Sequence, residues 1–244
     1  MAKVVKPYNE GESKKEQVSQ MFDNIAPKYD FLNRFLSLGI DQVWRKKAIK
    51  QLEGLDIKNM LDVATGTGDV ALALSKRYPQ AEIIGVDISE KMLEIGRQKV
   101  AKQQLSEKID LRTGDSENLP LKDNSFDAVT VAFGVRNFEN LSQGLAEIHR
   151  VIRPGGRLVV LEFSRPKVFP FKQLYNFYFR NILPNIGRAT SKDNKAYSYL
   201  YESVQAFPDG QNFMDELSKV AFKAKKCIPL TLGICTVYVA EKLA

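Results

Sequence analysis

The sequence predicts an α/β fold built on a doubly wound, mostly parallel sheet. The first observation is an apolar strand, a glycine turn and a helix in direct succession over 61–74. The second is an acid, Asp87, which ends the next apolar run about 20 residues after Gly68. The third is a chain of 244 residues, 44% of them hydrophobic, with no linker-like tract. We therefore expect one domain over residues 1–244.

The first strand, turn and helix form a site for a ligand. Asp62 lies in the strand, and Gly66 and Gly68 follow in a turn where a Cβ would keep a ligand away from the backbone. The next helix directs its free N–H groups at that ligand. Asp87, at the end of the second strand, is placed to accept hydrogen bonds from ribose hydroxyls. The pattern indicates an adenosine-containing cofactor.

The identity of this cofactor depends on Asp62. Residues 66–71 fit the dinucleotide pattern G-x-G-x-x-G/A, but a carboxylate close to the turn would repel a pyrophosphate. It would attract a sulfonium or an ammonium group. S-adenosylmethionine carries both cations and no phosphate, so we expect it to bind at Asp62, Gly66, Thr67 and Gly68. A dinucleotide-dependent reductase and a tight turn without ligand remain as alternatives.

The later strands follow in the expected order. The alternating run 109–113 predicts a third strand that ends at Gly114, so Asp115 can accept from an adenine amino group while the N–H of Ser116 donates to the ring. Residues 125–132 predict a fourth strand. The segment Arg153-Pro154-Gly155-Gly156 predicts the end of a helix and a turn into a fifth strand over 157–163, because proline cannot continue the helix.

Taken together, these motifs resemble those of class I S-adenosylmethionine-dependent methyltransferases. More closely, the chain is similar to the ubiquinone/menaquinone biosynthesis C-methyltransferases from about residue 17 onward. The segments that carry this narrower resemblance are 22–30 (FDNIAPKYD), 133–137 (FGVRN), 161–166 (LEFSRP), 197–203 (YSYLYES) and 207–208 (FP). The resemblance implies a seven-stranded sheet with helices on both faces and an antiparallel last strand.

The resemblance also implies an activity, C-methylation of a polyprenylated quinol ring, with demethylmenaquinol as the favoured acceptor. A benzoquinol of ubiquinone biosynthesis is the alternative acceptor, and a cofactor-binding regulator is the non-enzymatic alternative. Thr67 would then hold the methionine part. Arg136 and Asn137 would polarise the quinol oxygen, although the same two residues could simply brace their loop. Tyr199 and Tyr201 are further acceptor-side candidates.

One position departs from the family pattern, because Tyr238 stands in the last strand where relatives usually carry a His. We expect Tyr238 to cap the edge of the sheet. His149 is the only histidine and is expected at the surface, and Cys227 and Cys235 lack metal-ligand spacing. No metal site is therefore expected.

Nearly all of the net charge of +7 comes from one stretch, 165–200, which also holds eight aromatic residues. Its seven bases, set against the single acid Asp193, are Arg165, Lys167, Lys172, Arg180, Arg188, Lys192 and Lys195. A packed insertion with solvated charges and a nucleic-acid surface are two interpretations. We favour a third, an amphipathic lid that lies on anionic lipid and admits an apolar tail, within an acceptor-side insertion over 165–205. No nucleic-acid partner is expected.

The N-terminal residues 1–53 predict a helical cover for the cofactor, since Val18, Phe22, Ile25 and Tyr29 recur at helical spacing. The first residues lack the apolar core of a signal peptide, and no apolar run approaches the length of a membrane span. We expect a cytoplasmic protein that attaches peripherally to the inner face of the membrane.

Overall fold

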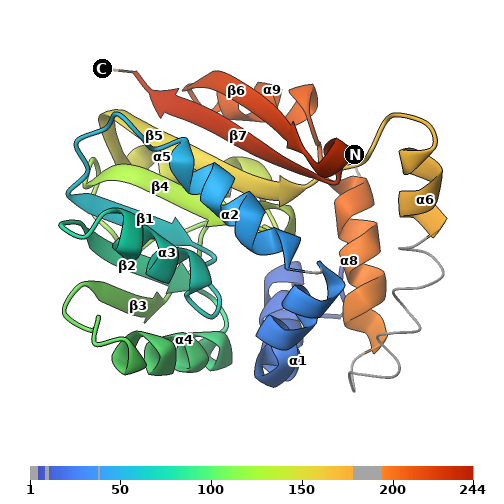
Figure 1. Cartoon of the computed structure of the whole chain (residues 1–244), viewed down its shortest axis with the longest axis horizontal. Coiled ribbons are helices and arrows are strands. Elements are labelled where there is room, and N and C mark those ends of the chain that lie inside the picture. Colours follow the sequence, from blue (N-terminus) through green and yellow to red (C-terminus); the bar gives the residue numbers. More distant parts are fainter. Residues whose placement is uncertain (1–4, 9–10, 38, 178–193, 244) are drawn as a thin grey trace.

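The computed structural model describes residues 5–8, 11–37, 39–177 and 194–243, and its centre is a seven-stranded sheet (Figure 1). The strand order is β3-β2-β1-β4-β5-β7-β6, with β1 to β5 parallel and β7 antiparallel to both of its neighbours. The strands are β1 (Asn59–Val63), β2 (Glu82–Asp87), β3 (Ile109–Thr113), β4 (Phe126–Ala132), β5 (Ile152–Phe163), β6 (Phe222–Leu230) and β7 (Cys235–Lys242). The predicted fold class and its antiparallel last strand are confirmed.

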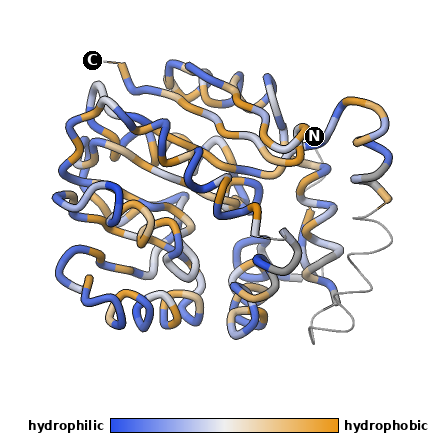
Figure 2. Tube along the Cα trace, in the orientation of Figure 1, coloured by the Kyte–Doolittle hydropathy of each residue, from blue (hydrophilic) through white to orange (hydrophobic). Residues whose placement is uncertain are grey.

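Helices cover both faces of the sheet, because the central strands bury side chains on both sides. In β5, Val159 and Leu161 pack under one set of helices, whereas Leu158 and Val160 pack under the other. The first set is α2 (Ile40–Lys50), α3 (Asp69–Arg77) and α4 (Glu90–Lys102), and the second is α5 (Leu141–Val151) and α9 (Gln211–Lys219). Figure 2 shows the hydrophobic colour concentrated along the central strands.

Two further helices stand at one end of the sheet, α1 (Lys14–Leu36) and α8 (Asn194–Ala206), with α6 (Phe171–Phe177) outside them (Figure 1). A capping box begins α1, since the amide of Ser13 donates to Glu16 and the amide of Glu16 donates to the Ser13 hydroxyl. Val18 and Met21 of α1 share a small apolar cluster with α8. No helix in the described ranges is long and apolar enough to cross a membrane.

Two details differ from the expectations. Tyr238 is fully buried and does not cap an edge, because β7 lies inside the sheet between β5 and β6; its hydroxyl accepts a hydrogen bond of 2.8 Å from the amide of Gly210. The segment 153–156 lies within β5 and not in a turn before it. A bulge accommodates this segment, since Phe126 pairs with Ile152 but Ala128 pairs with Arg157.

The basic and aromatic stretch over 165–200 is described in part. Arg180, Arg188, Lys192 and Asp193 lie outside the described residues. Among the described residues Arg165 forms an ion pair of 2.7 Å with Asp209, so this base is neutralised within the fold.

Candidate active site

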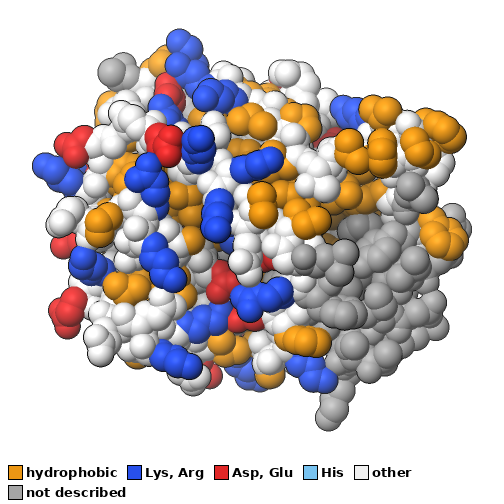
Figure 3. Space-filling view, viewed as in Figure 1, with side chains coloured by type: hydrophobic (Ala, Val, Ile, Leu, Met, Phe, Trp, Pro, Cys, Tyr) orange, Lys and Arg blue, Asp and Glu red, His pale blue; other side chains and the backbone are white. Residues whose placement is uncertain are grey.

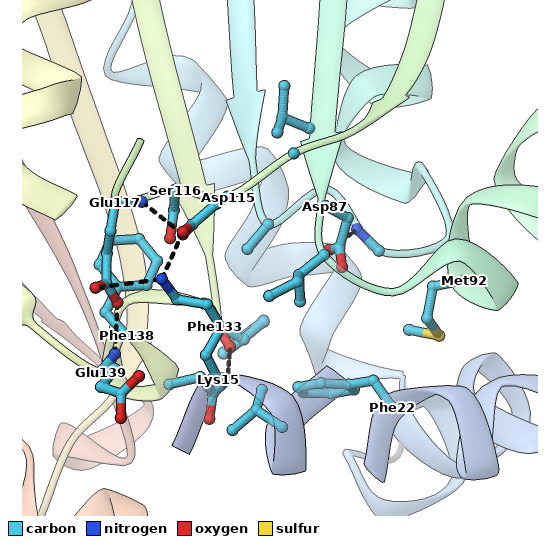
Figure 4. A pocket seen from close by; sticks show the side chains of 18 of the residues that line it. Lys15, Phe22, Asp87, Met92, Asp115, Ser116, Glu117, Phe133, Phe138 and Glu139 are labelled. Carbon is cyan, nitrogen blue, oxygen red and sulfur yellow. Dashed lines mark hydrogen bonds and ion pairs between the residues drawn. The ribbon is translucent and has the colours of Figure 1, made fainter. Parts of the chain in front are cut away.

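A pocket opens at the carboxyl ends of β1 to β4, where the strand order reverses between β1 and β4 (Figure 4). Open α/β sheets bind their ligands at this position. The lining comes from the four strand ends, from the loop around η1 (Val135–Asn137) and from one face of α1. From α1 the lining side chains are Lys15, Val18, Phe22 and Tyr29.

The charged side chains of the lining give this pocket an acidic character. Four carboxylates line it, those of Asp87, Asp115, Glu117 and Glu139, against the single ammonium of Lys15. Figure 4 shows Asp115, Glu117 and Glu139 together on one side of the pocket and Asp87 across from them. A cationic ligand therefore fits this pocket better than a pyrophosphate does.

The glycine turn after β1 has a backbone conformation that suits glycine. Gly66 and Gly68 have φ values of 55° and 75°, in the left-handed region that favours glycine. Gly66 lines the pocket, and a Cβ added to it would lie 3.4 Å from the Met92 side chain. The turn thus exposes backbone to the pocket, as a close-fitting ligand requires.

Asp62 lies beneath this turn and not in the pocket lining. It is 1% exposed, and its two carboxylate oxygens accept hydrogen bonds of 2.6 Å from the hydroxyls of Thr65 and Thr130. Burial raises the pKa of Asp62 to about 6, and the two hydroxyls oppose that shift. Asp62 therefore ties the turn to β4, and its charge acts on the pocket only from behind the turn.

Asp87 lies at the end of β2 and does line the pocket. One carboxylate oxygen accepts from the amide of Gly66 at 2.7 Å, and the other accepts from the amide of Ser89 at 2.9 Å. A carboxylate has about four lone-pair positions, so about two remain for a ligand. Burial raises the pKa of Asp87, and the backbone donors partly offset this effect.

Asp115 and Ser116, predicted to contact the adenine, line the pocket after β3. The Asp115 carboxylate also forms an ion pair with Lys15 of α1, at 2.5 Å, and Glu117 lies 3.7 Å from the same ammonium group. Lys15 therefore bridges α1 to the loop that was expected to hold adenine, an arrangement visible in Figure 4.

Thr67 is buried and holds α1 instead of facing the pocket. Its hydroxyl donates to Asp30 of α1 at 2.6 Å and accepts from Lys99 of α4 at 3.0 Å. Lys99 also forms ion pairs with Asp30 and Asp69. This network fixes α1 over the glycine turn, beside the pocket that other side chains of α1 line.

The backbone is strained just after β1 and β4, where these strands reach the pocket. Ala64 and Phe133 both line the pocket and have φ values of 54° and 59°. Gly134 approaches Ala64 so closely that an added Cβ would lie 2.5 Å from the Ala64 Cβ. Such strain concentrates at ligand sites, because the surrounding structure must hold it in place.

Arg136 and Asn137 follow in η1, but only Asn137 lines the pocket. The Arg136 side chain is buried, donates to Glu162 at 2.7 Å and lies over the Phe163 ring at 5.4 Å. The Arg136 Nε and the Asn137 Oδ1 have no hydrogen-bond partner in the described part of the chain. Lys14 holds this loop from α1 by donating to the carbonyls of Arg136 and Phe138.

Several of these residues carry no strong signal in the sequence. Lys15 and Glu117 act through an ion pair between distant segments, and Glu162 is recognisable only as an acid inside an apolar strand. The capping motif that starts at Ser13 was the available sign that α1 begins there. His149, expected at the surface, is half-buried with its ring edge-on to Phe222, away from the pocket.

Solved structures share this fold at low sequence identity. A SAM-dependent methyltransferase from Thermotoga maritima, described as a possible histamine N-methyltransferase, has a TM-score of 0.64 at 21% identity and covers 91% of this chain and 98% of its own. The [4+2]-cyclase SpnF has a TM-score of 0.67 at 18% identity, over 96% and 98%. Because a cyclase shares the fold, these likenesses establish architecture and not activity.

Sequence relatives are much closer. A demethylmenaquinone methyltransferase from Bacteroides fragilis is 50% identical over 238 residues, 98% of this chain and 97% of that protein. The ubiquinone/menaquinone biosynthesis C-methyltransferase UbiE from Geotalea daltonii is 49% identical over 230 residues, 94% and 97%. The model of the ubiE/COQ5 methyltransferase family matches residues 10–242. The resemblance noted from the motifs is thus confirmed, and the chain belongs to the ubiE/COQ5 methyltransferase family.

Proposed function

We propose that this methyltransferase uses S-adenosylmethionine to methylate a ring carbon of a polyprenylated quinol, converting demethylmenaquinol to menaquinol. The observation that carries the proposal is the acidic pocket at the switch point, in a chain 50% identical to a protein named demethylmenaquinone methyltransferase. A benzoquinol is the second candidate acceptor, favoured by the relative whose name includes ubiquinone.

The pocket residues fit this cofactor. The free lone pairs of Asp87 suit two ribose hydroxyls, and the glycine turn leaves room for close approach at Gly66. Asp115 and Ser116 are placed for the adenine, provided that Lys15 releases or shares the Asp115 carboxylate. The excess of carboxylates supports a sulfonium and an ammonium group in this pocket, and it argues against a dinucleotide-dependent reductase.

The cofactor, when bound, supplies a methyl group that is already attached to a good leaving group. The chain must then align the acceptor carbon and stabilise charge on the neighbouring ring oxygen. In the reaction a ring C–H bond is replaced by a C–CH3 bond and one proton leaves. Arg136 is the proposed donor to the ring oxygen, because its buried Nε has no partner among the described residues, and Asn137 is the proposed acceptor for the quinol hydroxyl, because its buried Oδ1 has none either.

We also propose that the surface around α6 rests on an anionic membrane, where a polyprenylated acceptor resides. Val168, Phe169 and Phe177 are 66%, 76% and 59% exposed, and Leu232 of the neighbouring loop is 60% exposed. Lys167 and Lys172 lie exposed in the same stretch. In Figure 3 hydrophobic side chains gather at the upper right, with a basic patch at their edge, in the region where Figure 1 places α6. Apolar side chains beside lysines suit an anionic lipid surface.

Quinone analysis of a strain lacking this gene tests the proposed reaction. The strain should accumulate demethylmenaquinone, and the gene should restore menaquinone. Accumulation of a demethylated benzoquinone alone would show that the acceptor is the benzoquinol. Unchanged quinones would argue for a cofactor-binding regulator.

A further inference from the structure

At η1 and on the helix beside it, three buried polar atoms have no hydrogen-bond partner among the described residues. Two are the Nε of Arg136 and the Oδ1 of Asn137, and the third is the hydroxyl of Tyr199 on α8, the helix that packs on η1. Tyr199 is 3% exposed, so solvent does not satisfy its hydroxyl. Folded proteins pair nearly all of their buried polar groups, and each exception calls for an explanation. Three exceptions in one place point to a ligand that supplies the missing partners.

The position of Tyr199 connects it to the pocket. Its ring belongs to an apolar cluster with Val18 and Met21 of α1, and Val18 also lines the pocket. On its other side, η1 contributes Asn137 to the same lining. Tyr199 is therefore buried between α1 and η1, beside elements that line the pocket, and the charges of Arg136 and Glu162 act on its hydroxyl.

The charges near Tyr199 favour a donor role for its hydroxyl. Burial raises the pKa of Tyr199, and the Glu162 carboxylate adds to this shift while Arg136 opposes it. The phenol therefore keeps its proton at any working pH and cannot act as the base. Glu162 already occupies the Nη1 of Arg136, at 2.7 Å, which leaves the Nε of Arg136 as a second donor.

We propose that Tyr199 contacts the acceptor, its hydroxyl donating a hydrogen bond to the ring oxygen next to the carbon that is methylated. This inference rests on the proposed function. The ring oxygen accepts from Tyr199 and from the Arg136 Nε, and Asn137 Oδ1 accepts from the quinol hydroxyl while it is protonated. Because a donor favours the ionised form of the oxygen, Tyr199 promotes transfer of the phenolic proton to water and makes the ring carbon electron-rich. That carbon takes the methyl group as S-adenosylhomocysteine leaves. The ring C–H proton then passes to water and the oxygen regains a proton, so one proton is released in all.

Tyr199→Phe tests this role, since it removes only the hydroxyl. With a short-tailed demethylated naphthoquinol, kcat/KM should fall about ten- to a hundredfold, the effect of losing a hydrogen bond to a charged group. The deficit should shrink as pH rises, because the quinol then ionises without help. The affinity for S-adenosylhomocysteine should stay unchanged, and Tm should be unchanged or higher, because an unpartnered buried hydroxyl is removed.

The matched control is Tyr78→Phe. The Tyr78 hydroxyl is also buried without a partner in the described residues, but Tyr78 follows α3 and packs against the core cluster on the opposite face of the sheet from Val135 of η1, so its loss should leave turnover unchanged. If wild-type protein methylates the quinol and Tyr199→Phe is equally active, the inference is wrong. A lower Tm, weaker S-adenosylhomocysteine binding or an equal loss in Tyr78→Phe would also overturn it. If the wild type methylates no quinol, the proposed function itself fails.

Discussion

Replacing Asp87 by Asn measures how much one carboxylate contributes to cofactor binding. In the structure two of its lone pairs accept backbone amides, from Gly66 at 2.7 Å and Ser89 at 2.9 Å, and about two remain for ribose hydroxyls. The amide of Asn keeps one oxygen and loses the charge, so at least one charge-assisted hydrogen bond is lost. Such a bond contributes about 1.5–3 kcal/mol, which corresponds to a Kd raised about ten- to a hundredfold.

The substitution also affects the fold, and the assay must separate the two effects. In Asn the NH2 group faces one of the two backbone amides, which should cost about 1–3 kcal/mol of stability, whereas Ala would leave both amides unpaired. Calorimetric titration with S-adenosylhomocysteine gives the affinity, and urea unfolding without ligand gives the stability. Asp110→Asn, at an exposed acid of the neighbouring strand, is the control. Wild-type affinity in Asp87→Asn would refute the ribose assignment.

Three further predictions concern other charges. Burial raises the pKa of Asp62 from 3.8 to about 6, so the protonated carboxyl adds to the free energy of unfolding below about pH 4. This addition, about 3 kcal/mol, is lost as the pH rises through 6. In urea unfolding at successive pH values, Asp62→Asn should not show this decrease in stability. Glu162→Gln leaves the Arg136 guanidinium uncompensated in a buried pair, so stability should fall by about 3–5 kcal/mol and quinol turnover should fall more than S-adenosylhomocysteine affinity. Reversing Lys167 and Lys172 to Glu should abolish sedimentation with anionic vesicles, since each base near such a surface contributes about 1 kcal/mol.

Each of these predictions has an outcome that would contradict it. Identical pH profiles in wild type and Asp62→Asn would show that this carboxyl does not titrate as described. Unchanged melting of Glu162→Gln would remove the argument from the buried pair. For the membrane surface, Lys46→Glu with Lys47→Glu reverses two exposed bases on α2 and should leave vesicle binding intact. Salt-insensitive binding, or none in the wild type, would favour a packed insertion with solvated charges.

The cofactor half of the pocket could be predicted because its signals are local. Gly66, Gly68, Asp87 and Asp115 each lie at the end of an apolar run, and parallel strands bring such ends to one edge of the sheet. The role of Asp62 was predicted less well. Its distance from the glycines was visible in the sequence, but one of the two threonine hydroxyls that hold it under the turn, that of Thr130, comes from β4, 68 positions away.

Two other features depend on pairings that no local pattern contains. Lys15 of α1 meets Asp115 of the adenine loop across 100 positions of sequence, and on the acceptor side Arg136 of η1 meets Glu162 of β5. The prediction that Tyr238 caps the edge of the sheet was wrong for a related reason. The order of β7 and β6 in the sheet decides whether a strand is internal, and alternating apolar residues do not specify that order.

The most direct test of the account is methyl transfer by the purified protein from S-adenosylmethionine labelled with carbon-13 in its methyl group to a reduced, short-tailed demethylated naphthoquinol. The product is examined by NMR. The account predicts one labelled methyl group on the ring carbon next to a hydroxyl-bearing carbon, with S-adenosylhomocysteine formed in equal amount. A methyl group on oxygen, transfer to a benzoquinol alone, or no transfer would contradict it.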